Sequence, residues 1–361
     1  MSKHPVNSPE PAVVDLQARI DDAVKNNKRL KICGSNSKSF LYPGAATSDG
    51  MPPEDLYVDY PGVVSYQPSE LVLSVRASTG LDEIHATLEE QHQMLGFEPP
   101  ALGDAASIGG TVAAGLSGCA RPYAGSIRDA VLGIKMLTGR GELVRFGGEV
   151  MKNVAGYDVS RLLVGSMGSL GVILEVSMRV TPQLPAQAYL HVRCNEGEAF
   201  EEMLRLRKLS LPISGLAYDG KHLHVRLAGS EIAIDESSSS LADFVPEEAN
   251  FWQQLNEQKL AFFADAKNLW RIVVPLDRSI GSRLHGDRIW DWGGGLCWLK
   301  SDEPAAAIHR AAKEVHGSAR LFKGSAVTAE KTMVAEPVRA IRARLKQVFD
   351  PHAVFADHGL W

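Results

Sequence analysis

Apolar residues recur along the chain with two different periods, and each period predicts one kind of secondary structure. Leu16, Ile20 and Val24 stand four residues apart, which predicts an amphipathic helix over residues 15–27. Short runs rich in apolar and β-branched residues predict strands instead. In the first half of the chain we expect strands at 30–33, 71–76, 130–137, 142–146 and 171–180, and further helices at 80–93 and 157–163.

The pattern changes after Thr181-Pro182, where the last of these strands stops. Beyond this point strands and helices alternate with few glycines, an order that predicts an α+β domain similar to a ferredoxin-like sandwich. A last amphipathic helix runs from about Thr328 to Phe349. In this part we expect strands at 189–194, 222–227, 269–275 and 296–299, and helices at 198–209, 237–243 and 305–316.

Glycines are concentrated in one part of the chain. Of the 33 glycines, 16 lie between Gly96 and Gly171. Loops of glycine and small polar residues present backbone N–H groups that bind phosphate, although a tight turn is the simpler explanation of any one such loop. The loops match neither GxxxxGK[ST] nor GxGxxG, so ATP, GTP and Rossmann-type NAD sites are poorly supported. The glycine-rich or small-residue clusters are 34–38, 103–111 with Gly115 and Gly118, and 152–158 with 165–173.

Charge and cysteine content exclude several classes of protein. Lys and Arg number 38 against 43 Asp and Glu, a formal net charge of −5, which argues against a nucleic-acid binder and a polybasic membrane anchor. The sequence has no apolar run long enough to span a membrane, so we expect no direct membrane span. The four cysteines are far apart and predict neither a disulfide framework nor a zinc or iron–sulfur site: Cys33, Cys119, Cys194 and Cys297.

Four motifs follow one another in the glycine-rich half: Ser107-Ile108-Gly109-Gly110, residues 121–129, residues 152–158 and residues 168–173. Together they resemble the FAD-binding domain of the vanillyl-alcohol oxidase/p-cresol methylhydroxylase (PCMH) type. The runs 149–158, 290–296 and 349–351 are similar to the FAD-binding accessory subunits of bacterial glycolate oxidases. The resemblance covers nearly the whole chain.

This resemblance implies an α+β fold in three parts and non-covalently bound FAD. Residues 1–182 would form a two-subdomain PCMH-type FAD-binding domain, residues 183–325 a ferredoxin-like α+β cap, and residues 326–361 a C-terminal helix packing back on the FAD domain. For Lys38 a solvated loop lysine is the alternative to a phosphate partner, and for Arg128 and Asp129 a surface ion pair is the alternative to a pocket wall. The implied cofactor-binding residues are Gly34, Ser35, Asn36, Ser37, Lys38, Gly103, Ser107, Ile108, Gly109, Gly110, Thr111, Gly125, Arg128, Asp129, Lys152, Asn153, Tyr157, Gly171, Val172 and Ile173.

The catalytic residues are not evident from the sequence. Oxidation of a 2-hydroxy acid by a flavin needs a base for the hydroxyl proton and a cation for the carboxylate. The catalytic subunits of the family carry a histidine-rich metal and base motif, of which this chain has only fragments, so we expect no metal site. His222 and His224 alternate along their strand and are expected on one solvent-facing side. Arg271 is the one candidate for holding an anion.

The resulting interpretation is the FAD-binding subunit of a glycolate (D-2-hydroxy acid) oxidase or dehydrogenase that converts glycolate to glyoxylate. Its expected partners are a larger catalytic flavoprotein, an iron–sulfur subunit and a small 2-hydroxy acid, with no nucleic acid. The expected location is the cytoplasm. A further expectation is peripheral attachment to the inner membrane through the partner subunits. Two alternatives stay open: a self-sufficient FAD-dependent 2-hydroxy-acid dehydrogenase, and a non-catalytic assembly subunit.

Overall fold

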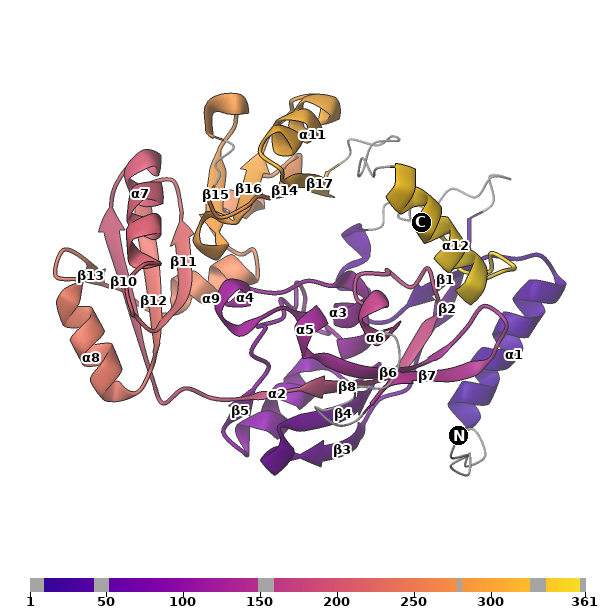
Figure 1. The fold of residues 1–361 in the computed structure, drawn as a ribbon. Coiled ribbons are helices and arrows are strands. Elements are labelled where there is room, and N and C mark those ends of the chain that lie inside the picture. The colour runs from indigo at the N-terminus through magenta and orange to yellow at the C-terminus, as the bar shows by residue number, and fades with distance from the viewer. Residues whose placement is uncertain (1–9, 42–51, 149–158, 278–280, 325–335, 358–361) are drawn as a thin grey trace.

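The computed structural model describes residues 10–41, 52–148, 159–277, 281–324 and 336–357. Figure 1 shows an N-terminal domain in indigo and magenta and a cap in pink and orange, with the C-terminal helix in yellow at the upper right of the view. Among the described helices, none is long and apolar enough to cross a membrane.

The N-terminal domain begins with a small two-stranded subdomain. Helix α1 (Pro11–Lys25) buries Val13, Leu16, Ile20 and Ala23. Leu16 and Ile20 of the predicted stripe are thus buried, whereas Val24 is only half-buried. Strand β1 (Leu30–Cys33) pairs in parallel with β2 (Glu54–Tyr57). The backbone of Leu30 also pairs with Phe355, so residues near the C-terminus complete this subdomain.

The second subdomain is a five-stranded antiparallel sheet in the order β3-β4-β8-β6-β7. The predicted hairpin is confirmed, because β6 and β7 pair in register from Leu137 opposite Leu143. The helix expected at 80–93 is shorter than predicted: His92 has a φ of 51°, and Gln93–Met94 forms the short strand β5 against Thr181–Pro182 (β9). The elements are β3 (Val63–Gln67), β4 (Val72–Arg76), α2 (Leu81–Glu89), α3 (Ile108–Ala114), α4 (Arg121–Ala124), α5 (Ile127–Ala130), β6 (Val131–Leu137), β7 (Leu143–Gly147), α6 (Val159–Leu162) and β8 (Val172–Arg179).

The cap is one eight-stranded sheet in the order β13-β10-β12-β11-β15-β16-β14-β17. Its first half, β10-α7-β11-β12-α8-β13, has the fourth-first-third-second strand order of a ferredoxin-like unit. The second half repeats this order with β14, β15, β16 and β17, and the two halves join through β11 and β15. The sequence predicts one such sandwich for the whole cap, whereas the structure has one complete unit and a second half that repeats its strand order without an α-helix between β14 and β15 among the described residues. The elements are β10 (Ala186–Arg193), α7 (Glu196–Leu206), β11 (Ile213–Tyr218), β12 (His222–Gly229), α8 (Glu231–Ser240), β13 (Val245–Pro246), α9 (Asn250–Asn256), α10 (Ala261–Ala264), β14 (Leu269–Val273), β15 (Arg288–Asp291), β16 (Leu296–Lys300), α11 (Ala305–Glu314) and β17 (Ser318–Lys323).

The two faces of the cap sheet have different neighbours. One face packs on α7, α8 and α11 around Leu223, Val225 and Leu227. The other face packs on α9, α10 and the N-terminal domain through a cluster that includes Trp252 and Trp298. This second face is the one that meets the N-terminal domain. Helix α8 begins at Glu231 rather than at 237, because the Ser230 side chain caps it by accepting from the Ala233 N–H at 3.3 Å.

Helix α12 (Glu336–Phe349) leads back to the N-terminal domain (Figure 1). At its C-terminal end, Lys346 Nζ donates to Ser169 O at 2.6 Å, to Asp350 Oδ2 at 2.7 Å and to Phe355 O at 2.9 Å. Asp350 is fully enclosed and accepts from the backbone N–H groups of Val354 and Phe355. These bonds hold the C-terminal segment together and tie it to the start of β8, while its pairing with Leu30 ties it to the first subdomain.

Candidate functional site

A cavity of about 820 Å³, partly open to solvent, lies between the two subdomains of the N-terminal domain. Its wall begins where β1 ends and continues along the N-terminal end of α3. Small residues and backbone make up most of the surface. The lining residues are Lys31, Ile32, Cys33, Gly34, Ser35, Asn36, Ser37, Lys38, Ser39, Val58, Ala77, Ser78, Ser107, Gly109, Gly110, Ala113, Met167, Gly168, Gly171 and Ile173.

The loop 34–38 supplies backbone donors to this cavity. Asn36 takes a left-handed conformation with φ of 59°, which folds the loop back before the short 3₁₀ turn Ser39–Leu41. In the described part of the chain, the N–H groups of residues 34–38 have no protein acceptor. Consecutive amides around a left-handed residue form a concave anion-binding nest. The loop is therefore built to receive a negatively charged group.

Lys38 is buried within this loop. Its Nζ donates to Ala101 O at 3.0 Å, and its side chain is nearly fully covered. Burial lowers the pKa of Lys38 to about 8, while the nearby Glu257 carboxylate acts in the opposite direction. Of the two alternatives left open by the sequence, the structure excludes a solvated loop lysine.

The start of α3 forms the opposite wall. Ser107 caps the helix, and its Oγ accepts from the Gly110 N–H at 3.3 Å. The N–H of Gly109 donates to Ala77 O at 2.8 Å, so this donor is already used by the protein. A Cβ at Gly109 would lie 2.7 Å from Ala77 Cβ, which makes glycine necessary for the close contact of α3 with this strand end.

Ten of the predicted cofactor-binding residues line this cavity, and the others that the structure describes lie elsewhere. Ile108, Thr111 and Val172 are enclosed in the protein interior, and Gly103 lies behind the loop, next to Ser37. Lys152, Asn153 and Tyr157 lie outside the described residues. The ten that line the cavity are Gly34, Ser35, Asn36, Ser37, Lys38, Ser107, Gly109, Gly110, Gly171 and Ile173.

Gly125, Arg128 and Asp129 do not line the cavity, in contrast to the expected pocket wall. Asp129 instead caps α5, where its Oδ2 accepts from the Ser126 N–H at 2.9 Å and from Ser126 Oγ at 2.7 Å. These bonds hold the pKa of Asp129 below its usual value. Arg128 is exposed. The reason is local: Asp129 belongs to the capping box of α5, which directs its Oδ2 to Ser126 instead of the cavity.

Sequence reasoning missed the parts of the wall that other strands contribute. Ala77 and Ser78 follow β4, and Val58 follows β2. Ile32 and Cys33 belong to β1 itself, where they looked only like a strand. Burial raises the pKa of the Cys33 thiol to about 11. The only signal for these positions is that each stands at or beside a strand end.

A second, smaller cavity of about 340 Å³ lies between the N-terminal domain and the cap. Leu102 and Gly118 line it from one side, and Arg271, Asp291 and Trp298 line it from the other. The sequence-predicted Arg271 therefore faces an interdomain cavity and not the larger one.

Positive charge gathers at this interdomain cavity. The guanidinium groups of Arg271 and Arg121 lie 4.9 and 4.3 Å from the ring centroid of Trp292. Burial, followed by the like charges of Arg121 and Arg320, lowers the pKa of Arg271 to about 10. Asp291 is buried beside them, and burial raises the pKa of its carboxyl group to about 6. An anion in this cavity would meet the guanidinium group of Arg271 and the carboxyl group of Asp291, with Arg121 nearby on the Trp292 ring.

Buried polar contacts hold the domains together around this cavity. Arg226 forms an ion pair with Glu98 at 2.8 Å and is almost fully buried. Trp292 Nε1 donates to Gly118 O at 2.9 Å. Glu257 accepts from the backbone N–H groups of Ala101 and Leu102, each at 2.9 Å. The cap is thus fixed over the loop that also holds Lys38.

This chain is similar to known proteins in both fold and sequence. An FAD binding domain family matches residues 12–147. Glycolate oxidase subunit GlcE of Escherichia coli (strain K12) is 43% identical over 343 residues, covering 94% of this chain and 95% of that protein. D-2-hydroxyglutarate dehydrogenase of Xanthomonas citri pv. viticola is 28% identical over 186 residues, 49% of this chain and 38% of that enzyme.

The structure of p-cresol methylhydroxylase with substrate bound superposes with a TM-score of 0.69 at 13% identity, covering 96% of this chain and 86% of that one. This likeness extends the fold assignment to the cap as well as the N-terminal domain. The PCMH-type α+β fold is therefore confirmed. With 43% identity over almost its full length, the chain belongs to the family of the glycolate oxidase subunit GlcE and contains its FAD-binding domain.

Proposed function

We propose that this chain is the FAD-carrying subunit of a multi-subunit complex that oxidises glycolate, or a related D-2-hydroxy acid, to the 2-oxo acid, which is glyoxylate in the case of glycolate. The observation that carries the proposal is the cavity beside loop 34–38, whose unbonded amides and small residues suit a dinucleotide pyrophosphate. The 43% identity to a glycolate oxidase subunit supports the substrate class.

Both backbone and side-chain groups of this cavity would bind FAD. The N–H groups of residues 34–38 would donate to the pyrophosphate oxygens, and the Lys38 ammonium would supply a positive charge from the base of the loop. Gly110 leaves the start of α3 free of side chains on the cavity side. Bound FAD supplies a hydride acceptor for the oxidation of the hydroxy acid.

We propose that FAD is bound non-covalently. The described lining residues include one cysteine, Cys33, and no histidine or tyrosine, and the raised pKa of Cys33 keeps its thiol protonated at neutral pH. Precipitation of the protein with acid tests this point: we expect all flavin in the supernatant. Flavin retained in the pellet would show a covalent bond.

The interdomain cavity supports a role in holding an anion. Arg271 would pair with the carboxylate of a small 2-hydroxy acid, with Arg121 adding positive charge. No histidine is among the described residues lining this cavity, so a base for the hydroxyl proton is not evident there. We therefore propose that a larger catalytic flavoprotein subunit carries out substrate oxidation and that an iron–sulfur subunit receives the electrons. Attachment of the complex to the inner membrane through these subunits is part of the same proposal.

Absorption and turnover measurements distinguish the proposal from its two alternatives. The purified chain should show oxidised flavin bands near about 370 and 450 nm, and a chain without flavin would favour the assembly subunit. With an artificial acceptor, the single chain should not oxidise glycolate, whereas the co-purified complex should. Turnover by the single chain would establish the self-sufficient dehydrogenase instead.

A further inference from the structure

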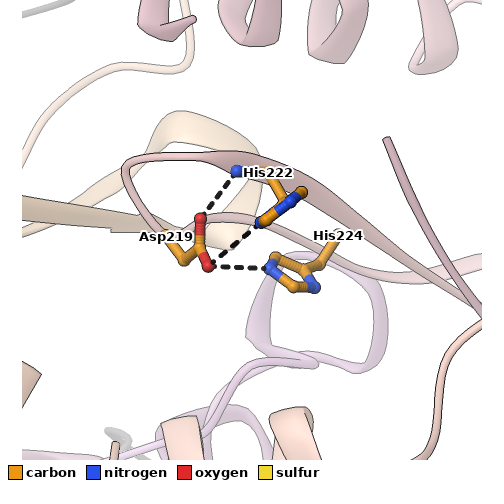
Figure 2. Close-up of side chains that lie close together, drawn as sticks. All are labelled: Asp219, His222 and His224. Atoms are coloured by element: carbon orange, nitrogen blue, oxygen red, sulfur yellow. Dashed lines mark hydrogen bonds and ion pairs between the residues drawn. The ribbon is translucent and has the colours of Figure 1, made fainter. Parts of the chain in front are cut away.

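A cluster of imidazole and carboxylate groups lies in the cap, apart from both cavities. Asp219, His222 and His224 place one ligand atom each within 4.8 Å of one another, as Figure 2 shows. Asp219 Oδ2 lies 3.6 Å from His222 Nδ1 and 3.4 Å from His224 Nε2. The sequence predicts no metal site, and the proposed flavin chemistry does not use these residues.

The local backbone explains why these three side chains meet. Because side chains alternate along β12, His222 and His224 project from the same face. That face is not the solvent-facing side expected from the sequence, because His224 is only 5% exposed and its ring stacks on Phe251 of α9 with centroids 3.5 Å apart. The turn between β11 and β12 then brings Asp219 to the start of the strand.

The Asp219 carboxylate is fixed with one oxygen free for the histidines. Its Oδ1 accepts from the backbone N–H groups of Lys221 at 2.8 Å and His222 at 2.7 Å. These two bonds fix the carboxylate, and its Oδ2 is directed at the two rings (Figure 2).

Glu247 orients the His224 ring from its other side. Its Oε2 lies 2.8 Å from His224 Nδ1, a contact that favours a proton on Nδ1 and a lone pair on Nε2. His224 Nε2 is buried and lacks a hydrogen-bond partner of good geometry among the described residues. In metal sites, a carboxylate usually forms a hydrogen bond with one nitrogen of the histidine while the other nitrogen binds the metal ion.

We propose that Asp219, His222 and His224 bind a divalent metal ion of the zinc type, with Glu247 holding the His224 ligand in place. Two imidazole nitrogens and one carboxylate oxygen are ligands that Zn²⁺ takes in proteins. Tetrahedral bonds of about 2.0–2.1 Å separate ligand atoms by about 3.3–3.4 Å, close to the two separations from Asp219 Oδ2. Asp219 and His222 are partly exposed, so a fourth position is open to water.

Metal at this site would join the β11–β12 turn to the strand face that packs on α9. The contribution is therefore to the cap, and it does not depend on the flavin site. His191, opposite His224 on β10, lies 3.7 Å from Glu247 through its Nδ1 and stays outside the proposed ligand set.

Metal titration of the untagged, FAD-loaded full chain tests the proposal. After removal of metal with a chelator, Zn²⁺ is added in competition with a chromophoric chelator. We expect one Zn²⁺ per chain with a dissociation constant below about 1 µM. His222→Gln and Asp219→Asn should each weaken binding about tenfold or more, and Glu247→Gln should weaken it by about tenfold.

The control variant is His316→Gln, which removes an exposed histidine elsewhere in the cap and should leave Zn²⁺ affinity unchanged. Circular dichroism and flavin absorption of every variant verify folding and FAD content separately from the metal. In the unmodified chain, Co²⁺ should give the visible bands of a tetrahedral site, and these should be lost in His222→Gln. Absence of stoichiometric Zn²⁺ binding would overturn the proposal and assign the cluster to hydrogen bonding alone. Equal Zn²⁺ affinity in the unmodified chain, Asp219→Asn and His222→Gln would overturn it as well.

Discussion

The cavity of the N-terminal domain and the side of the cap that faces this domain are lined by different kinds of chemical group. The cavity of the N-terminal domain is lined mainly by backbone and small residues, and its one deeply buried charge is Lys38 among the described lining residues. The facing side of the cap carries buried charged side chains, among them Arg226 and Asp291. Backbone donors suit a pyrophosphate that is the same in every FAD molecule, whereas side chains suit the recognition of one particular anion.

This contrast predicts that the N-terminal cavity is most sensitive to added volume and the cap to changes of charge. Gly109→Val gives the first and largest test, because even a Cβ would lie 2.7 Å from Ala77 Cβ and 2.9 Å from Ala77 O. We expect α3 to shift, with FAD binding about 100-fold weaker and the chain about 2–3 kcal/mol less stable. Fluorescence titration of the apoprotein with FAD and urea unfolding measure these effects.

Gly80→Ala is the matched control for this substitution. Gly80 precedes α2 with φ of −65°, and a Cβ there meets no atom within 4 Å. Its FAD affinity should equal that of the unmodified chain. If Gly109→Val bound FAD normally, the close contact of α3 with Ala77 would not shape the cofactor site.

Removal of charge tests the cap side. Glu98→Gln takes away the partner of the buried Arg226, which also bonds to Ser214 Oγ and Ser214 O at 3.0 Å each. We expect a loss of about 2–3 kcal/mol in the free energy of unfolding, because an unpaired buried guanidinium remains. Urea unfolding measures the loss.

The control is Glu202→Gln, which breaks the more exposed pair with Arg205 on α7. That change should cost less than about 0.5 kcal/mol. Similar losses in the two variants would contradict the distinction between buried interdomain charge and surface charge.

Asp291→Asn tests the carboxyl group at the interdomain cavity through pH. The pKa of Asp291 is about 6 in the folded chain, higher than about 3.9 for an unfolded aspartate, so the folded state binds the extra proton. The free energy of unfolding of the unmodified chain therefore falls as pH rises from about 4 to about 6 and stays lower above that range.

The asparagine variant lacks this decline. Relative to the unmodified chain, it should gain about 2 kcal/mol of stability between pH 4 and pH 8, as measured by unfolding at both values. A constant stability difference at the two pH values would show that burial does not perturb Asp291.

Lys38→Met gives the smallest expected effect and asks how much the single lysine adds to the backbone donors. We expect about tenfold weaker FAD binding at pH 7, equal to about 1.4 kcal/mol. Because the pKa of Lys38 is about 8, FAD affinity of the unmodified chain should fall as pH rises through 8, and the variant should lack this fall. The FAD dissociation constant from pH 6.5 to 9.5 provides the measurement.

Lys25→Met, an exposed lysine at the end of α1, serves as the control and should keep the pH dependence. A Lys38→Met profile that matched the unmodified chain at every pH would mean that the backbone alone holds the pyrophosphate.

The sequence predicted well those features that depend on neighbours along the chain. The spacing of Leu16, Ile20 and Val24 predicted α1, and Thr138-Gly139-Arg140-Gly141 predicted the β6–β7 hairpin. Strand β11 was missed, because Ser214 and Gly215 interrupt its apolar pattern and Gly215 is needed beneath the ring of Trp252. The second half of the cap was only partly foreseen. Strand β17 pairs with the more distant β14, and β15 lies between its neighbour β16 and the distant β11.

The residues of the candidate sites also fall into two groups: those predictable from their neighbours along the chain and those placed by contacts between distant segments. Loop 34–38 and the start of α3 were predictable, because glycine and small polar residues restrict the backbone locally. Asp129 was assigned to a pocket wall, yet its carboxylate caps α5 by accepting a hydrogen bond from the N–H of Ser126, three residues earlier. The convergence of Arg121, Arg271 and Trp292 was not predictable, because they come from segments about 150 and 20 residues apart that only domain packing brings together.

By itself, the sequence determined the type of chain: a glycine-rich FAD-binding half followed by an α+β half, in an order that resembles one flavoprotein family. Only the tertiary structure decided which residues face the cavity, that Lys38 and His224 are buried, and that Asp219 meets two histidines. The reason is that backbone conformation responds to residues a few positions away, whereas burial, charge and ligand geometry depend on contacts between distant segments.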